Sequence, residues 1–395
     1  MAAVEFKKVD IVFGDEPEAA LGLLDQGKTR DEIHEATGNV LGVADASLAV
    51  GEGEICVLMG LSGSGKSTLL RAVNGLNKVI RGEVLVQDEG KQVDVASCGP
   101  QTLRHLRTNR IAMVFQQFAL LPWRTVRENV GFGLELRGMG EAERNKIVDE
   151  KLKLVALDQW ADKYAHELSG GMQQRVGLAR AFATDADILL MDEPFSALDP
   201  LIRDRLQDEL LALQQSLNKT ILFVSHDLDE ALKIGNHIAI MEGGYIVQYG
   251  RPEDIVLNPA NGYVADFVAH MNPLNVLRGG SLMTPAEKLN RDGETVVLDQ
   301  DGHLRLTLDS GGAPKEVSLD QRPGRIVPYE DGMDMDALDH DVIVTADPDM
   351  RMRTAIELRH ATGRPVILVS DGKMVGVCGD EEIYRGILRQ TGSMD

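Results

Sequence analysis

One eight-residue stretch of this 395-residue chain limits its fold more than any other feature. Residues 60–67 read Gly-Leu-Ser-Gly-Ser-Gly-Lys-Ser and match the phosphate-binding pattern G-x-x-x-x-G-K-S/T. The apolar run 55–59 before them predicts a buried strand, and a helix is expected to begin near Lys66. Glycines allow a sharp turn and the close approach of a ligand, and N–H groups at a helix start attract anions. The stretch therefore predicts a nucleotide-phosphate site in an α/β fold.

The roles within this loop follow from residue chemistry. Lys66 supplies a positive charge to the β- and γ-phosphates, and the Ser67 hydroxyl can ligate Mg²⁺. A glycine-rich turn without a ligand is the alternative interpretation, which the predicted strand–loop–helix context disfavours. The residues expected to contact the nucleotide here are Gly60, Ser62, Gly63, Ser64, Gly65, Lys66, Ser67 and Thr68.

A second apolar run ends in two acidic residues. Residues 188–191 predict another core strand, and Asp192 and Glu193 follow at its carboxyl end, where open α/β sheets bind ligands. We expect Asp192 to hold Mg²⁺ together with Ser67, and Glu193 to orient and polarise the attacking water. A solvated acid pair at the end of a strand is the alternative. Beside the phosphate loop, the pair instead predicts hydrolysis of a nucleoside triphosphate.

Between these motifs, residues 168–175 read Leu-Ser-Gly-Gly-Met-Gln-Gln-Arg, in which Ser169 can cap a helix. With the phosphate loop and the paired acids, this run resembles the LSGGQ signature of the nucleotide-binding subunits of ABC transporters. Met172 stands between the second glycine and Gln173, a variant similar to that of many importer subunits. The resemblance implies ATP as the nucleotide and a head-to-tail dimer with a second copy. In such a dimer, the residues that would contact the γ-phosphate held by the partner are Ser169, Gly170 and Gly171.

Further motifs of that family occur in the expected order. Gln116 matches the glutamine that senses metal and water, although the adjacent Gln117 leaves the assignment open by one residue. Asp199 matches the loop that crosses between subunits, and His226 matches the switch histidine at the γ-phosphate. Phe13 is the candidate for stacking on adenine, with a core or surface role as the alternative. The resemblance thus implies catalytic roles for Glu193, His226 and Gln116, and metal binding by Ser67, Gln116 and Asp192.

The resemblance also implies the architecture of residues 1–275. They are expected to form an ABC-type P-loop ATPase domain of the α/β class, with a RecA-like core, an antiparallel β subdomain and a helical subdomain near 117–168. Residues 15–40 insert two short helices, begun by a proline and a capping box, with no catalytic chemistry of their own. This insert, with residues 59–65 and 71–74, resembles subunits that energise import of the quaternary amines glycine betaine, proline betaine and choline.

The last third of the chain is expected to be a smaller α+β region. Residues 276–340 are polar and rich in glycine, and predict a linker or a degenerate half of a CBS-like pair, with short strands expected at 296–298 and 304–308. The β-α-β-β-α order predicted over residues 341–395 looks like one CBS repeat, with a hairpin turn at 371–372. Gly379 and Glu382 stand where that family carries the Ser/Thr and Asp that bind adenine nucleotides. We therefore expect a dimerising or regulatory role rather than nucleotide binding.

Composition limits the partners. The net charge of −21 argues against nucleic acid as the main partner, because phosphate backbones require surfaces rich in Lys and Arg. No apolar stretch approaches the ~18–20 residues of a membrane-spanning helix, and the first residues lack a signal-peptide pattern. The three cysteines fit a reduced cytosolic protein. We expect a peripheral position at the cytoplasmic face of the inner membrane, where segment 118–126 would contact integral-membrane permease subunits and an external substrate-binding protein would be an indirect partner.

Two other functions stay open at this point. The chain could serve an importer of another small polar solute, such as an amino acid or a polyamine. A soluble, non-transport ABC ATPase is the second alternative, although such proteins usually carry two cassettes or a long coiled coil, and the sequence shows neither. The transported solute is selected by the permease and the external binding protein, so this sequence does not identify it, and overall resemblance alone slightly favours choline over glycine betaine.

Overall fold

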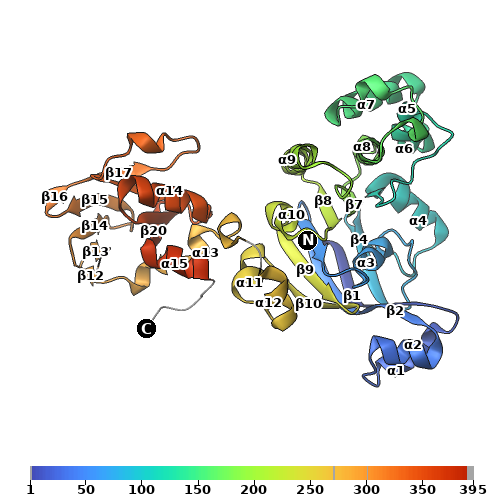
Figure 1. The fold of residues 1–395 in the computed structure, drawn as a ribbon, viewed down its shortest axis with the longest axis horizontal. Helices are drawn as coiled ribbons and strands as arrows, with labels where there is room; N and C mark the ends of the chain where they lie inside the picture. The colour runs from blue at the N-terminus through green and yellow to red at the C-terminus, as the bar shows by residue number, and fades with distance from the viewer. Residues whose placement is uncertain (1, 270–271, 300, 389–395) are drawn as a thin grey trace. The chain divides into compact units, whose positions relative to one another are not determined.

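The computed structural model describes residues 2–269, 272–299 and 301–388 (Figure 1). The chain divides into two compact units, Met1–Arg251 and Pro252–Asp395. The sequence placed the domain boundary later, at 275/276, and two helices therefore fall in the second unit, namely α11 (Pro252–Leu257) and α12 (Gly262–Val268). The ends of the predicted domains at residue 1 and residues 389–395 lie outside the described residues.

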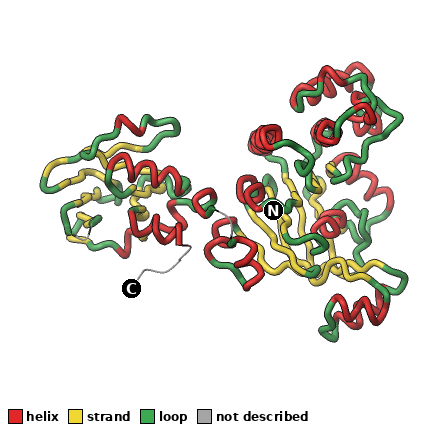
Figure 2. The backbone as a smooth tube through the Cα atoms, in the orientation of Figure 1, coloured by secondary structure: helices red, strands yellow, loops and turns green. Residues whose placement is uncertain are grey.

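The larger sheet of the first unit has six strands, in the order β10 (Tyr245–Gly250), β9 (His237–Glu242), β3 (Ile55–Met59), β8 (Thr220–Val224), β7 (Ile188–Asp192), β6 (Ile111–Val114). Neighbouring strands pair in parallel, except that β10 pairs antiparallel to β9. Figure 2 shows these strands lying side by side. Every residue of β3, β7 and β8 is buried. Continuous apolar runs are typical of parallel sheets that are covered on both faces.

A second, antiparallel sheet has the order β2 (Val40–Gly51), β1 (Ala2–Phe13), β4 (Arg81–Asp88), β5 (Lys91–Asp94). One hydrophobic core joins it to the larger sheet and to α3 (Lys66–Ala72). Phe6 of β1, Leu58 of β3 and Leu190 of β7 belong to this core, together with Leu69 of α3. The RecA-like core and the antiparallel β subdomain therefore pack as one body around the helix that follows the phosphate loop.

Helices connect the parallel strands, because parallel pairing requires a crossover. The crossovers are α8 (Gly170–Ala183) before β7, α9 (Pro200–Leu217) before β8 and α10 (Leu228–Ile234) before β9. Ahead of β6 lie α4 (Pro100–His105) and the π-helical turn η1 (Leu106–Arg110). The predicted helical subdomain consists of α5 (Val126–Val130), α6 (Phe132–Leu136), α7 (Glu141–Leu154), η2 (Asp158–Trp160) and η3 (Ala165–Glu167). Among the described helices, none is both long enough and apolar enough to cross a bilayer.

The insert forms the two predicted helices, α1 (Pro17–Leu24) and α2 (Arg30–Thr37). The predicted capping box opens α2, since Thr29 Oγ1 accepts the Glu32 N–H at 3.3 Å and Glu32 Oε2 accepts the Thr29 N–H at 2.8 Å. Gly38, with a φ of 70°, ends the helix. The apolar sides of both helices pack against β1 and β2 in a small cluster of Val12, Ala20, Leu21, Ile33, Leu41 and Ala44.

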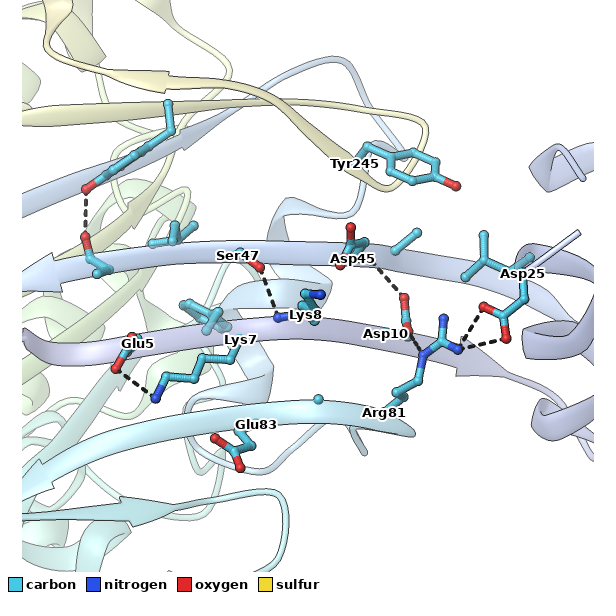
Figure 3. A pocket seen from close by; sticks show the side chains of 17 residues that line it. Glu5, Lys7, Lys8, Asp10, Asp25, Asp45, Ser47, Arg81, Glu83 and Tyr245 are labelled. Atoms are coloured by element: carbon cyan, nitrogen blue, oxygen red, sulfur yellow. Dashed lines mark hydrogen bonds and ion pairs between the residues drawn. The ribbon is translucent and has the colours of Figure 1, made fainter. Parts of the chain in front are cut away.

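An ion-pair clamp also fastens the insert to the antiparallel sheet (Figure 3). Asp10 on β1 is only 1% exposed, and its carboxylate accepts the Asp45 N–H at 2.7 Å. Arg81 on β4 donates from Nε to Asp10 at 2.5 Å and from Nη1 to both carboxylate oxygens of Asp25, at 2.8 and 3.0 Å. Because Asp25 follows α1 directly, Arg81 joins the buried carboxylate of the sheet to the end of an insert helix.

We expect Arg81→Ala to destabilise the first unit by about 1–3 kcal/mol, because the buried Asp10 carboxylate loses its charged partner. Arg81 is 43% exposed, so water screens part of the interaction and the lower part of that range is expected. Lys7→Ala is the matched control, because the Lys7 side chain is 47% exposed and pairs with the partly buried Glu5 at 3.5 Å. Urea unfolding should show a loss below about 1 kcal/mol for the control. Equal small losses in both variants would contradict the prediction.

The second unit has the β-α-β-β-α order predicted for the C-terminal segment, namely β18 (Val342–Ala346), α14 (Met352–Thr362), β19 (Val366–Ser370), β20 (Lys373–Cys378) and α15 (Asp380–Leu388). β19 and β20 form a hairpin, and the turn residues Asp371 and Gly372 have φ values of 49° and 75°. The predicted hairpin turn is therefore confirmed. Two strands from the preceding segment complete the sheet at its edges, β17 (Arg325–Pro328) beside β18 and β11 (Thr284–Pro285) beside β20.

The strands described between residues 291 and 323 form a five-stranded antiparallel sheet, of which the sequence predicted two short strands, at 296–298 and 304–308. Its strands are β12 (Arg291–Asp292), β13 (Thr295–Val297), β14 (Leu304–Leu308), β15 (Pro314–Leu319) and β16 (Arg322–Pro323). Leu304, Leu306 and Leu308 alternate into a core that also contains Ile343 and Ile367 of the other sheet. The helical segments described between residues 276 and 340 are short, namely α13 (Gly279–Leu282), η5 (Ala286–Lys288) and η6 (Met335–Ala337).

Candidate active site

The loop after β3 has the backbone conformation that its glycines predict. Gly60, Gly63 and Gly65 have φ values of 140°, 79° and 103°, which L side chains rarely adopt. A Cβ at Gly60 would lie 2.1 Å from the carbonyl oxygen of Met241, and one at Gly65 would lie 2.5 Å from that of Gly42. These two glycines are therefore required by close contacts with neighbouring strands. The loop is held by the sheet before any ligand arrives.

Lys66 lies at the base of this loop and is only 7% exposed. Its ammonium group donates to the carbonyl oxygens of Gly60 and Leu61, at 2.8 and 2.9 Å. Burial lowers the pKa of Lys66, while the nearby charges of Glu193 and Asp192 raise it. A phosphate oxygen is a stronger acceptor than a backbone carbonyl. The ammonium group can therefore exchange these internal contacts for the anion that the loop is shaped to receive.

The predicted metal-side residues Ser67 and Asp192 lie in contact. Asp192, at the end of β7, has no exposed surface, and its Oδ1 accepts the Ser67 hydroxyl at 2.6 Å. Arg71 donates from Nη2 to the other carboxylate oxygen at 2.8 Å. Arg71 was not among the predicted site residues. Ser67 and Arg71 are four residues apart and therefore share one face of α3, a spacing that could have indicated the contact.

The three predicted catalytic residues lie together. Glu193 Oε2 is 3.1 Å from Gln116 Nε2 and 3.3 Å from His226 Nδ1. Glu193 has a φ of 48°, a rare conformation for a residue other than glycine. Such strain occurs often at functional sites. Glu193 comes directly after β7. Its N–H donates to the carbonyl oxygen of Val224 on β8, at 3.1 Å.

A buried glutamine braces this arrangement from the signature helix. Gln174 on α8 has no exposed surface, and its Nε2 donates to the carbonyl oxygen of Glu193 at 3.1 Å. Its Oε1 accepts the N–H of Ala197 at 3.0 Å. Ser196 Oγ donates to the same Glu193 carbonyl, also at 3.1 Å. Gln174 thus ties the signature helix to Glu193 and to the loop before Asp199, a link that the sequence did not indicate.

These residues surround a pocket of about 480 Å³. Gln116 lines the pocket, whereas Gln117 is not among its described lining residues. Phe13 is 43% exposed and lies at the pocket, as its proposed stacking role requires. Arg30 was not predicted to be there. The described lining residues are Phe13, Arg30, Val40, Gly42, Ser62, Gly63, Gly65, Lys66, Ser67, Thr68, Gln116, Glu193 and His226.

Six predicted nucleotide residues do not line this pocket, namely Gly60, Ser64, Ser169, Gly170, Gly171 and Asp199. Gly60 and Ser64 are buried within the loop, and the Gly60 carbonyl oxygen accepts a hydrogen bond from the Lys66 ammonium group. Ser169 and Asp199 cap α8 and α9, accepting the N–H groups of Met172 at 3.4 Å and Ile202 at 3.1 Å. Ser169, Gly170 and Asp199 are exposed. The chain therefore does not bring its own signature residues to its own phosphate loop.

A buried carboxylate supports the loop that carries His226. Glu230 on α10 accepts hydrogen bonds from Ser225 Oγ at 2.5 Å and from Gln207 Nε2 at 3.0 Å. Burial raises the pKa of Glu230, and the two hydrogen bonds oppose this shift. Ser225 precedes His226, and Gln207 lies on α9. The Glu230 carboxylate therefore joins the loop that carries His226 to α9, the helix that Asp199 caps.

Because the pKa of Glu230 is raised on folding, its contribution favours the folded state at low pH and is lost as pH rises through the raised value. Glu230→Gln cannot titrate, so we expect its stability to vary less with pH just above the usual glutamate range. Unfolding midpoints measured from about pH 5 to pH 8 would test this. Asp229→Asn, an exposed neighbour on the same helix, should keep the wild-type pH dependence. Parallel curves for wild type and Glu230→Gln would refute the prediction.

The parallel sheet, the phosphate loop, and the acids and switch histidine at adjacent strand ends define an ABC-type ATPase, an enzyme that binds and hydrolyses ATP. The family model described as ABC transporter matches residues 43–196. The chain is 48% identical over 305 residues to the glycine betaine transport ATP-binding protein OpuAA of Bacillus subtilis, a match that covers 77% of this chain and 70% of that protein.

Over 264 residues it is 53% identical to the glycine betaine/proline betaine transport system ATP-binding protein ProV of Escherichia coli, covering 67% of this chain and 65% of ProV. The chain therefore belongs to the ABC transporter ATP-binding proteins, in the group that contains OpuAA and ProV. The match spans about two thirds of these relatives. Among solved structures, the dimeric MJ0796 cassette is 30% identical with a TM-score of 0.55, covering 63% of this chain and 98% of the cassette. MJ0796 bound to ADP and Pi matches equally well.

Proposed function

We propose that this chain hydrolyses ATP to power import of a quaternary ammonium osmolyte, with glycine betaine or proline betaine as the first candidates and choline as the third. The observation that carries the proposal is the identity of about half of the aligned residues with proteins named for glycine betaine transport. The pocket is lined by Lys66, Ser67, Glu193 and His226, and the buried Asp192 contacts Ser67 behind it, so the side chains needed for turnover are present. The same relatives favour this cargo over amino acids or polyamines, and transport over a non-transport ATPase.

Transport in proteoliposomes tests the cargo. The chain would be reconstituted with its membrane subunits and its external binding protein, and uptake of radiolabelled glycine betaine, choline, proline and putrescine would be compared. We expect ATP-dependent uptake of the quaternary amines alone. Uptake of proline or putrescine in their place would overturn the assignment, while leaving the ATPase itself intact.

Mg²⁺ fits the residues on the metal side of the pocket. Ser67, Asp192 and Gln116 offer a hydroxyl, a carboxylate and an amide oxygen, which are the hard oxygen donors that this cation prefers. We propose that these three side chains hold Mg²⁺, which would neutralise charge on the phosphates when bound. Glu193 would orient and polarise the water, and His226 would support the γ-phosphate. Gln116 and His226 both lie beside the same Glu193 oxygen, Oε2, at 3.1 and 3.3 Å.

A second copy of the chain is the proposed partner at the nucleotide. Ser169 and Gly170 are exposed and are distant in sequence from the phosphate loop. The solved structure of the related MJ0796 cassette is a dimer. A mixing experiment tests a head-to-tail arrangement. Lys66→Ala and Ser169→Arg should each abolish hydrolysis, and a mixture should regain part of it, because one of the two sites of a mixed dimer has neither change. No recovery on mixing, or full activity of a monomer, would contradict the dimer.

The membrane contact is proposed at the helical subdomain. Trp123, in the segment that precedes α5, is 71% exposed, and a large exposed aromatic side chain is typical of a binding surface. Neighbouring Arg124 lies over the ring of Phe132, 4.9 Å from its centre, which stiffens the segment. Permease subunits docking here would hold the chain peripherally at the cytoplasmic face of the inner membrane. The external substrate-binding protein would act on it only through those subunits.

The second unit is proposed to be CBS-like and regulatory. Its β-α-β-β-α order supports this proposal. The contacts of Glu382 support the expected lack of nucleotide binding. Glu382 is buried, where it accepts the Gly379 N–H at 2.8 Å and the Arg385 guanidinium at 3.1 Å, and it also accepts the Thr284 hydroxyl. A carboxylate so engaged is unavailable to a ribose. If hydrolysis by the reconstituted complex keeps its salt response after deletion of residues 280–395, a regulatory role in sensing ionic strength is wrong.

A further inference from the structure

One side chain of the two-helix insert reaches the nucleotide pocket. Arg30, the first residue of α2, lines the pocket beside Phe13 and Val40. Its Nη1 donates to the carbonyl oxygen of Gly63, in the middle of the phosphate loop, at 2.7 Å. The insert is thus connected to the loop that binds the phosphates, although 33 residues separate the two partners in the chain.

The structure fixes Arg30 in this position from several directions. The capping box at Thr29 and Glu32 sets where α2 begins, and Ile33, three residues after Arg30, is fully buried against β1 and β2. The Arg81 clamp holds the other insert helix to the same sheet through Asp25 (Figure 3). An arginine at the start of a helix held in this way presents its guanidinium group at the pocket at little cost in conformational entropy.

The charge of Arg30 matters because the pocket contains few cations. Among its described lining residues, only Arg30 and Lys66 carry a permanent positive charge. Both donate to backbone carbonyl oxygens of the phosphate loop. A charged phosphate oxygen is the stronger acceptor, and the planar guanidinium group matches two such oxygens at once. Each of the two cations can therefore exchange a backbone carbonyl oxygen for an oxygen of an incoming triphosphate.

We propose that Arg30 is a nucleotide-binding residue supplied by the insert. When ATP enters, its guanidinium group exchanges the Gly63 carbonyl for oxygen atoms of the triphosphate, as Lys66 does from the base of the loop. The insert is then part of the ATP site, and a movement of α2 changes nucleotide affinity. This role adds to the expected set of nucleotide contacts and revises the expectation that the insert has no chemistry at the site.

Nucleotide titration of the full chain tests the proposal. Arg30→Ala should weaken ATP binding about 10-fold, as expected for the loss of one charge-assisted contact. The loss should shrink as salt is raised from about 50 mM to about 500 mM, because screening weakens a charge contact and leaves a purely steric support unaffected. Arg30→Lys keeps the charge and should retain part of the affinity. Arg30→Met, which keeps most of the stem, should behave like Arg30→Ala.

Lys28→Ala is the matched control. It removes the same charge from the same insert, and Lys28 is exposed and pairs with Glu32 rather than lining the pocket. It should leave ATP affinity within twofold of wild type, and thermal unfolding without nucleotide should show that the Arg30 variants remain folded. Wild-type affinity in Arg30→Ala and Arg30→Met would overturn the proposal. Equal losses in Lys28→Ala would also overturn it, since the effect would then be long-range charge. Lys66→Ala loses ATP in any case, so the ATP site and the role of Arg30 are tested separately.

Discussion

Glu193→Gln is expected to lower the rate of ATP hydrolysis by ~100-fold or more while ATP still binds, as expected for the loss of a positioned general base. The amide has the size and shape of the carboxylate, so the contacts with Gln116 and His226 and the strained backbone at this position can persist. It lacks the negative charge that polarises water. Lys66 and Ser67, which carry the binding contacts, are unchanged.

Phosphate release at saturating Mg–ATP would measure the rate, and a separate titration would measure ATP affinity. Glu242→Gln is the matched control, because Glu242 is an exposed acid at the carboxyl end of β9 in the same sheet and does not line the pocket. It should turn over ATP at the wild-type rate. A Glu193→Gln protein whose turnover stays within threefold of wild type would remove Glu193 from the mechanism.

Lys66→Ala should weaken ATP binding by about 100-fold, close to 3 kcal/mol, because a buried ammonium group can form short charge-assisted hydrogen bonds with phosphate oxygens. Its two present acceptors, the carbonyls of Gly60 and Leu61, belong to the loop itself. No other lining residue with a permanent charge lies at the base of the loop, since Arg30 contacts the loop at Gly63. The loss should therefore not be compensated.

Equilibrium titration with ATP would measure the loss, and thermal unfolding without nucleotide would show whether the variant is folded. Lys7→Ala removes an exposed lysine of the same unit and should bind ATP as the wild type does. Tight ATP binding by a folded Lys66→Ala protein would exclude the predicted role of this lysine. It would also contradict the prediction that the phosphate loop binds ATP through Lys66.

The sequence predicted the conformation of the phosphate loop and the position of the two acids because these signals are local. Three glycines spaced around a short turn can adopt left-handed angles in only a few ways, and the observed φ values match that requirement. An apolar strand followed by Asp192 and Glu193 places two acids at one strand end whatever the rest of the chain does. The capping box of the insert is likewise complete within four residues, and it formed as expected.

Contacts between distant segments were not predictable in this way. Arg30 reaches Gly63, and Gln174 reaches Glu193, only because helices from separate parts of the chain pack on the same sheets. Nothing in the local pattern around either residue specifies its partner. The sheet formed by the strands between residues 291 and 323 was predicted only in part, at 296–298 and 304–308, since its strands are two to six residues long and separated by turns that resemble a linker.

The amino-acid sequence by itself determined the family, the order of motifs and the phosphate loop, and it predicted the acid, the glutamine and the histidine that are expected to act on ATP. Tertiary structure decided which of these side chains touch, that Gln116 lines the pocket, and that the insert contributes Arg30. The physical reason is the separation along the chain between the residues that interact. Backbone angles and strand ends are set by neighbours in the chain, whereas a contact across 19 or 33 residues exists only after the core has fixed how its elements pack.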